Sequence, residues 1–414
     1  NPMRFLVWLP LFSSVFLLSD GLAEKAFLPT ANPASLGFSA AGLERLRQRQ
    51  QAFIDEGLCL SNVALVARKG KVIYYEAAQA DAPETRPIDG RHTLFPIWSM
   101  TKPVTSVAAM ILHQRDVFQL DDPVSKAIPL LDNCLVKTKE GDPVPLDRSI
   151  TYRDLLTHTS GIAGYDGSFD EEGTWKEIME LESNAAVIRL LTKKPIEHQP
   201  GIRYTYGMST AVLGRAIEVL TGQTLAGFFE KEIFGPLGMD QTRFYLTPAD
   251  RKRFQPLAVK KGEGFRPGTP AEDELYYAPE STLYLGGEGL VSTIEDYGRF
   301  CQMLVNRGRA PNGRPILSES TLDLMLKDHL AGLRETPTNP DGTVQGLGFA
   351  ILKDPSKSGD PSSPSGLYSW GGYHTTHFWV DPRNELYAIF MTRLYPFNKA
   401  TESRFRKAVY EAFK

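Results

Sequence analysis

A serine and a lysine stand three residues apart, Ser99 and Lys102, at the start of the apolar stretch IWSMTKPVTSVAAMILHQ. Residues three positions apart share one face of a helix, so both side chains can point into one cleft. A serine hydroxyl is a weak nucleophile until a neighbouring base takes its proton, and a buried lysine can be that base. The pair is therefore a candidate for nucleophilic catalysis.

The Ser-x-x-Lys spacing alone is a weak signal, because a helix-capping serine beside a solvated lysine produces it too. The spacing occurs only here in the chain. Pro103 follows the lysine directly, and proline fits a helix only in its first turn. The sequence therefore predicts that a helix starts close to Ser99.

Two further segments are able to line the same cleft. In PGIRYTYGMST, a Pro-Gly turn places Tyr204 and Tyr206 at the entrance of an apolar helix. In YSWGGYHTT, residues 368–376, two glycines interrupt a β run, which favours the close approach of a ligand or another backbone. Taken singly, a packing tyrosine and a β-bulge explain both segments. The three segments in this order are more specific.

In that order the segments resemble the serine β-lactamase and penicillin-recognising superfamily. The phrases LLTHTSGI (Leu155 to Ile162) and GGEGLVSTIEDYGRF (Gly286 to Phe300) resemble its class C and DD-peptidase branch. His158, within the first phrase, is expected to make a core hydrogen bond rather than to act in catalysis. The likeness covers nearly the whole chain after its N-terminal tenth. It implies a β-lactamase or transpeptidase-like fold.

The chain departs from the β-lactamase pattern at two motifs. Tyr206-Gly207-Met208 stands where that pattern has Tyr-x-Asn, and Trp370-Gly371-Gly372 stands where it has Lys-Thr-Gly. Both changes, and the tail HFWVDPRNELYAIFMTRL, resemble the family VIII carboxylesterases. A lysine on this strand would attract a substrate carboxylate, whereas tryptophan offers an apolar wall. The predicted substrates are therefore short-chain, uncharged acyl esters. The chain contains no G-x-S-x-G motif, which argues against an ordinary α/β-hydrolase.

The resemblance implies a role for each matching residue. Ser99 is the nucleophile, and Lys102 and Tyr206 form the proton network, with the identity of the base left open between them. The backbone N–H groups of Ser99 and Tyr373 are the expected oxyanion donors. The residues expected to contact substrate are Trp370, Gly371, Gly372, Met208 and His374.

Three other functions remain open at this stage. A β-lactamase or DD-peptidase is favoured by an export signal but opposed by Trp370 and Met208. An acyltransferase shares every catalytic residue and differs in excluding water. A penicillin sensor or binding module would keep the acyl group on Ser99. The partner expected in each case is a small-molecule ester or β-lactam.

The composition excludes several other classes of protein. Of 414 residues, 42% are hydrophobic and 23% charged, with a formal net charge of −3 and no basic run, so nucleic acid is not an expected partner. The 3 cysteines form neither a disulfide framework nor a C-x-x-C pair. The chain has no H-E-x-x-H motif, and we expect no metal and no cofactor.

The order of the predicted elements indicates the fold class. A helix over 40–56 and a hairpin of strands 62–67 and 72–76 come first, a helical and loop-rich stretch follows, and strands return near 347–352, 368–370, 377–380 and 386–392. We expect an α/β (α+β) fold, with one antiparallel sheet built from both ends of the chain, flanked by helices. The α/β domain would comprise residues 24–118 and 285–414, and the inserted helical lobe residues 119–284.

Residues 1–23 have the pattern of a secretory signal. Met3-Arg4 precedes the apolar run FLVWLPLFSSVFLL, and the small residues Gly21 and Ala23 follow it. The run is too short for a comfortable membrane span. The expected location is therefore periplasmic or secreted.

Overall fold

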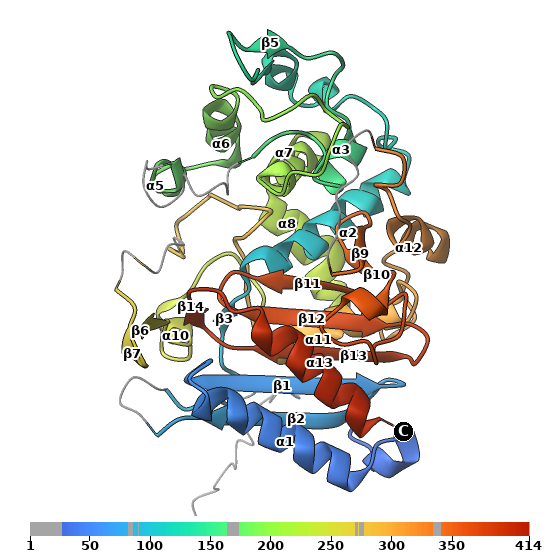
Figure 1. Ribbon diagram of the computed structural model, residues 1–414. Helices are drawn as coiled ribbons and strands as arrows, with labels where there is room; N and C mark the ends of the chain where they lie inside the picture. The colour runs from blue at the N-terminus through green and yellow to red at the C-terminus, as the bar shows by residue number, and fades with distance from the viewer. Residues whose placement is uncertain are drawn as a thin grey trace, which may run out of the picture.

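The centre of the fold is a seven-stranded antiparallel sheet in the order β2-β1-β13-β12-β11-β10-β9 (Figure 1). The computed structural model describes residues 27–81, 86–89, 91–163, 174–269, 272, 277–333 and 341–413. The strands are β1 Ser61–Arg68, β2 Lys71–Gln79, β9 Thr343–Gln345, β10 Ala350–Leu352, β11 Tyr368–Gly372, β12 Thr376–Asp381 and β13 Leu386–Met391. The predicted sheet from both ends of the chain is confirmed.

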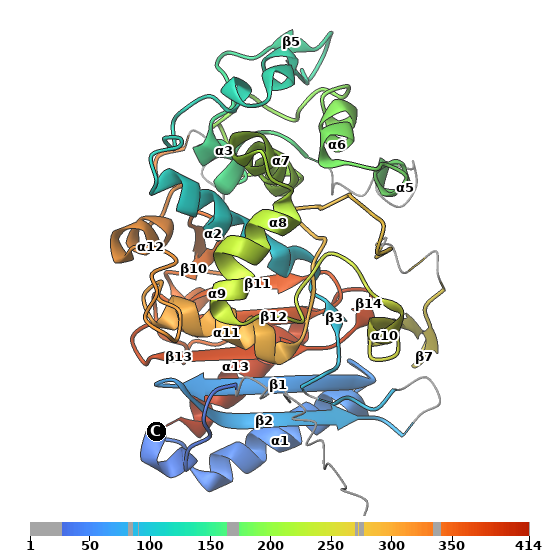
Figure 2. The same cartoon turned by 180° about the vertical axis from the view of Figure 1, so that it is seen from behind.

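Both faces of the sheet are covered, because β12 and β13 are buried along their whole length and β1 is buried up to Arg68, which is partly buried. Side chains alternate across a strand, and in β1 Val63 and Leu65 enter one core while Ala64 and Val66 enter the other. Helices α1 (Ala40–Asp55) and α13 (Ala400–Ala412) lie side by side over one face in Figure 1. Helix α11 (Ile294–Val305) covers the opposite face, in front in Figure 2.

The helices of the middle of the chain gather beyond the β11 side of the sheet (Figure 2). Helix α2 (Thr101–His113) lies between them and the sheet, and every residue from 101 to 112 is buried. The others are α3 Tyr152–Leu156, α5 Thr174–Met179, α6 Asn184–Leu191 and α7 Ser209–Thr221. From this group α8 Leu225–Phe229, the π-helix η5 Glu230–Phe234 and α9 Gly235–Leu237 lead down in front of the sheet to α11 (Figure 2). Helix α3 begins with a capping box formed by Thr151 and Asp154.

Several short elements complete the fold. Strand β3 (Phe95–Pro96) pairs with β8 (Val291–Ser292), and β4 (Leu135–Val136) pairs with β5 (Val144–Pro145). Helix α12 spans Glu319–Met325 and strand β14 spans Leu394–Tyr395. Short 3₁₀ helices are η1 Pro33–Leu36, η2 Trp98–Met100, η3 Val124–Lys126, η4 Pro129–Asn133 and η6 Pro355–Lys357.

The stretch 250–282 is polar and contains several prolines and glycines, which predicts a loop, but it contains regular structure. Helix α10 (Pro248–Arg251) enters it, and strands β6 (Ala258–Lys261) and β7 (Gly264–Pro267) form a hairpin that β14 joins. The prediction was wrong because these strands are short and carry exposed lysine and glycine rather than alternating apolar residues. Strand β9 was not predicted for a similar reason, since it has only three residues.

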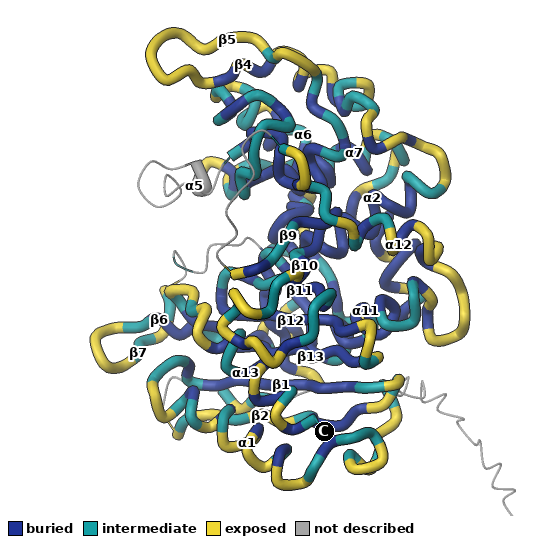
Figure 3. Tube along the Cα trace, turned by 45° about the vertical axis from the view of Figure 1, so that its right-hand side comes forward, coloured by how far each residue is buried: buried dark blue, intermediate teal, exposed yellow. Residues whose placement is uncertain are grey.

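Burial follows the layers of the fold (Figure 3). The inner strands are buried, whereas the turn between β4 and β5 and the outer side of α1 are exposed. The predicted signal over 1–23 lies outside the described residues. Within the described ranges, no helix has both the length and the apolar character needed to cross a membrane.

Candidate active site

Ser99 lies in a tight turn that leads into α2. The turn is the 3₁₀ helix η2, and Trp98 within it has a φ of 47°, which is uncommon for a residue other than glycine. Hydrogen bonds from both sides hold the turn. The Trp98 indole N–H donates to Nδ1 of His374 at 2.8 Å, and the Ile97 N–H donates to the Leu290 carbonyl at 3.0 Å. These bonds maintain the strained backbone conformation of Trp98, and this conformation sets the position of Ser99.

Lys102 lies one turn further along, with 1% of its surface exposed. Its Nζ donates to the Ser99 Oγ at 3.1 Å, the Gly287 carbonyl at 3.0 Å and the Glu288 Oε1 at 2.9 Å. Burial by itself lowers the pKa of this ammonium, but Glu288 and Tyr206 more than offset it, so the pKa lies above its ordinary value. At neutral pH the side chain is a buried cation whose donors all converge on the site.

Tyr206 completes the contacts to the nucleophile. Its hydroxyl donates to the Ser99 Oγ at 2.7 Å, and the Lys102 Nζ lies 4.9 Å from the centre of its ring. Tyr206, 107 positions after Ser99 in the sequence, therefore meets the Ser99–Lys102 pair at one hydroxyl oxygen. This is the geometry that acyl transfer to a serine requires.

The tyrosine is positioned by the phrase LLTHTSGI. The Thr205 N–H donates to the His158 carbonyl at 2.8 Å, and the hydroxyls of Ser160 and Ser209 lie 2.8 Å apart. A Cβ at Gly207 would overlap the backbone of the same phrase. The phrase thus holds Tyr206 in place. The core hydrogen bond expected for His158 is not found at its Nδ1, which is buried without a partner among the described residues.

His158 itself is buried against the site. Burial, and after it Lys102, lowers the pKa of its ring to about 3, so the imidazole is neutral at physiological pH. Its ring lies 4.9 Å from that of Tyr206 and 6.1 Å from that of Trp370, between centroids. The His158 imidazole therefore packs behind the Tyr206 ring as a neutral aromatic group.

The opposite wall of the site is the end of β11. The ladder with β10 covers Tyr368 and Ser369, and Trp370 to Gly372 lie beyond it. A Cβ at Gly372 would overlap the carbonyl oxygen of Ile97 and the hydroxyl of Thr376, so the strand approaches the serine turn backbone to backbone. This close approach, rather than a bulge, explains the second glycine.

Two aromatic side chains extend this wall. The Trp370 ring lies 6.1 Å from the Tyr206 ring, and the Tyr373 ring lies edge-on to Trp98 at 5.2 Å, both between centroids. The strand end that carries Trp370, Gly371, Gly372 and Tyr373 thus flanks the turn of Ser99. The sequence-predicted wall and nucleophile lie together.

Met208 and His374 are corrections to the predicted substrate contacts. Each has 0% of its surface exposed. Met208 belongs to the hydrophobic core at the start of α7, and His374 accepts the Trp98 bond beneath the turn. Met208 was predicted from its position in the tyrosine motif and His374 from its place just after the Trp-Gly-Gly segment, but both side chains point inward and offer substrate no surface.

Glu288 is the functional candidate that the sequence prediction missed. It has 2% of its surface exposed and pairs with Lys102, which is also buried. It was quoted only as part of GGEGLVSTIEDYGRF. The available signal was a lone acid within the apolar, glycine-rich run 285–291, because a charge in such a run needs a buried partner.

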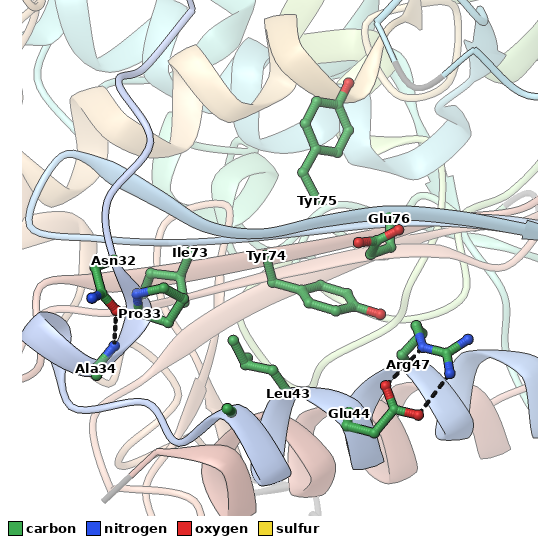
Figure 4. Close-up of a pocket in the computed structure, with 11 residues that line it drawn as sticks. Asn32, Pro33, Ala34, Leu43, Glu44, Arg47, Ile73, Tyr74, Tyr75 and Glu76 are labelled. Atoms are coloured by element: carbon green, nitrogen blue, oxygen red, sulfur yellow. Dashed lines mark hydrogen bonds and ion pairs between the residues drawn. The ribbon is translucent and has the colours of Figure 1, made fainter.

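Two other features carry no part of this chemistry. The part of the chain that is described holds no group of three or more histidine, cysteine or acidic side chains able to bind a metal ion. A hollow of about 370 Å³ lies between α1 and β2, lined by Leu43, Arg47 and Tyr74 among others (Figure 4). It is at the β2 edge of the sheet, four strands from β11.

The comparison with family models agrees with this geometry. The model described as Beta-lactamase matches residues 46–412. The chain belongs to the Beta-lactamase family. Esterase EstB of Burkholderia gladioli is 30% identical over 391 residues, which cover 87% of this chain and 93% of EstB.

Two solved structures are similar to this chain. The structure of EstCE1, described as a hydrolase with promiscuous acyltransferase activity, matches with a TM-score of 0.75 and 27% identity, covering 89% of this chain and 99% of EstCE1. The simvastatin synthase LovD from Aspergillus terreus shares the fold, with a TM-score of 0.74 and 21% identity over 90% of this chain and 98% of LovD. The predicted resemblance to family VIII carboxylesterases of this superfamily is confirmed.

Proposed function

We propose that this member of the Beta-lactamase family is a carboxylesterase that cleaves short-chain, uncharged acyl esters through an acyl-Ser99 intermediate. The observation that carries the proposal is the Ser99 Oγ, which accepts hydrogen bonds from both Lys102 and Tyr206. A hydroxyl held by an amine and a phenol can lose its proton as it attacks a carbonyl carbon. Similarity to the esterases EstB and EstCE1 supports the same reaction class.

The reaction has two halves. In the first, the Ser99 Oγ attacks the ester carbonyl, its proton enters the network of Lys102 and Tyr206, and the alcohol leaves with a proton from that network. The N–H groups of Ser99 and Tyr373 are the proposed donors to the oxyanion, each worth roughly 3 kcal/mol in the transition state. In the second half, water replaces the alcohol and attacks the acyl group on Ser99.

The preference for uncharged esters rests on charge. Glu288 neutralises Lys102, the cation at the nucleophile. The wall over the nucleophile is formed by the aromatic side chains of Trp370, Tyr206 and Tyr373 rather than by a cation. Apolar acyl chains gain free energy against such a wall, whereas a carboxylate would lose its hydration there without an ionic partner.

Kinetics with p-nitrophenyl esters test the proposal. The wild-type protein is expected to hydrolyse the butyrate ester, with a rate that falls for long acyl chains. Ser99→Ala is expected to abolish turnover while the circular dichroism spectrum is retained. Turnover by a folded Ser99→Ala protein would rule the mechanism out, and clear preference for nitrocefin over the butyrate ester would make the protein a β-lactamase instead.

Acyl transfer is the second candidate, because EstCE1 is described as having promiscuous acyltransferase activity. A transferase uses the same acyl-Ser99 species but passes it to an alcohol. Adding a primary alcohol to the butyrate assay and quantifying the new ester measures the partition. Hydrolysis alone at high alcohol concentration would exclude transfer.

A further inference from the structure

The buried carboxylate of Glu288 has a more specific place than its ion pair alone suggests. Its Oε1 accepts a hydrogen bond from the Lys102 Nζ at 2.9 Å, and the same Nζ lies 3.1 Å from the Ser99 Oγ. The other oxygen, Oε2, is buried and has no hydrogen-bond partner among the described residues. The carboxylate therefore makes its one strong contact to the lysine that touches the nucleophile.

The fold fixes this contact from two directions. Strand β8, which begins three residues after Glu288, pairs with β3, which leads directly into the serine turn. Gly286 lies between α2 and α7, where its carbonyl accepts from Thr105 at 2.5 Å and an added Cβ would meet the Thr210 carbonyl at 2.9 Å. The segment 286–290 is thus held against α2 on both sides of Glu288.

The charges in this arrangement restrict the path of the Ser99 proton. An ammonium that donates to Gly287, Glu288 and Ser99 has no lone pair with which to accept a proton. Ionising the Tyr206 phenol instead would bury two negative charges beside one positive charge, which a low-dielectric site opposes. Proton transfer from Lys102 to Glu288 avoids both difficulties, because it turns the ion pair into a neutral amine and a neutral acid.

We propose that Glu288 is the positioning residue that makes Lys102 a base, by storing the proton that the lysine gives up. The Ser99 hydroxyl proton moves to the Lys102 nitrogen while a different proton of Lys102 moves to Glu288 Oε1. The Ser99 oxygen forms the new bond to the carbonyl carbon, and the carbonyl electron pair becomes the oxyanion. On collapse, the bond to the leaving alcohol breaks, the alkoxide takes a proton from Lys102, and Glu288 returns its proton to the lysine.

Few other groups near this pair can change charge in the working range of pH. Tyr206 faces Lys102 from the loop before α7, and His158 and Tyr204 lie behind it. Burial, and after it Lys102, lowers the pKa of His158 to about 3, and burial raises the pKa of Tyr204 above its usual range. The acid limb of activity is therefore assigned to the Lys102–Glu288 pair, as a property of the pair rather than of either group.

This inference rests on the proposed esterase function and is tested by pH profiles of kcat/KM for p-nitrophenyl butyrate, with the released acid quantified by chromatography. The wild type is expected to lose activity only at acidic pH, where the carboxylate is already protonated. In Glu288→Gln the amide cannot store a proton. Activity at pH 7 is expected to fall roughly 100-fold and to return as the pH rises, because only the free amine of Lys102 can then act.

Two variants separate this role from a structural one. Glu288→Asp keeps the carboxylate and is expected to keep the acid limb of the wild type, at a lower kcat. Glu232→Gln removes a buried carboxylate paired with Arg115, away from the site, and is expected to leave the profile unchanged.

Several results would overturn the inference. The first is a wild-type kcat/KM that falls already in the pH range where a free amine titrates. The others concern Glu288→Gln: a pH profile like that of the wild type, greater activity than the wild type at neutral pH, or, in a folded protein, the same loss of kcat/KM at every pH. The acid side of the wild-type kcat/KM profile tests the role of Glu288 even if the variants do not fold. Failure of the wild type to hydrolyse the ester, or turnover by Ser99→Ala, would refute the esterase function instead.

Discussion

The indole N–H of Trp98 donates to Nδ1 of His374 across 2.8 Å, and this bond joins the two sides of the site. Indole nitrogen is only a donor, so Nδ1 is the acceptor and the neutral ring carries its proton on Nε2. Burial, and after it Arg393, holds the pKa of His374 well below its usual range, so the ring stays neutral. Trp98, the residue before the nucleophile, is thus fixed to His374, which follows β11. The ester carbonyl must fit between the serine turn and the end of β11.

Trp98→Phe should weaken both the fold and the reaction. The change leaves a buried imidazole acceptor without its donor, which costs about 1–3 kcal/mol of unfolding free energy. It also releases the left-handed turn that positions Ser99, so kcat should fall more than KM rises. Urea unfolding and steady-state kinetics measure the two effects. A variant with the stability and kcat of the wild type would show that the bond does not hold the turn.

The two glycines of β11 should respond differently to alanine. At Gly372 a Cβ overlaps the carbonyl oxygen of Ile97, and the serine turn must move away. A shift of about 1 Å in the nucleophile lowers kcat roughly 100-fold. At Gly371 the nearest atom is the Thr376 carbonyl oxygen at 3.3 Å, so alanine is expected to be tolerated within a few-fold. Equal kcat values for the two variants would contradict the close approach.

Much of the fold was predictable because its signals are local. The hairpin of β1 and β2 follows from two apolar runs that flank Lys69 and Gly70. These two residues adopt positive φ in the turn. The meeting of Ser99, Lys102 and Tyr206 was predictable only through resemblance to a family, since no local pattern brings Tyr206 107 positions back to Ser99. The three-residue spacing predicted the proximity of Ser99 and Lys102 but not that of Tyr206.

The rest depended on tertiary contacts. Glu288 acquires its role from the pairing of β3 with β8, two strands of two residues each, which periodicity does not reveal. The inward direction of Met208 and His374 depends on the packing of α7 and of the serine turn. For both residues, neighbouring positions in the sequence proved a poor guide to which side chains face the substrate.

Trp370→Lys should move specificity toward esters that carry a carboxylate. The new ammonium would lie at the partly exposed wall beside Tyr206 and provide the partner that the wild type lacks. An ion pair in such a position is worth about 1 kcal/mol, or roughly fivefold in kcat/KM. Hemisuccinate and butyrate aryl esters measure the ratio. Trp370→Leu is the control, because it removes the ring without adding charge and should leave the ratio low. An unchanged ratio in Trp370→Lys would show that this wall does not sense charge.

Two buried histidines should make the fold sensitive to acid. Burial lowers the pKa of His158 and of His377 to about 3, with smaller contributions from Lys102 and Arg406, whereas both titrate near 6.5 in the unfolded chain. Between these values the unfolded state binds more protons, so stability rises with pH and is lost as pH falls below about 6.5. Each histidine contributes a slope of about 1.4 kcal/mol per pH unit in this range.

His377→Phe tests this slope away from the active site. The His377 ring stacks on Phe390 at 5.1 Å and lies near Phe405, so phenylalanine suits the same aromatic core. Urea unfolding from pH 4 to 6.5 should show a slope smaller by about 1.4 kcal/mol per pH unit than in the wild type, while stability at pH 8 changes little. An identical slope in the variant would mean that His377 is protonated in the folded protein, and that burial does not keep this ring neutral.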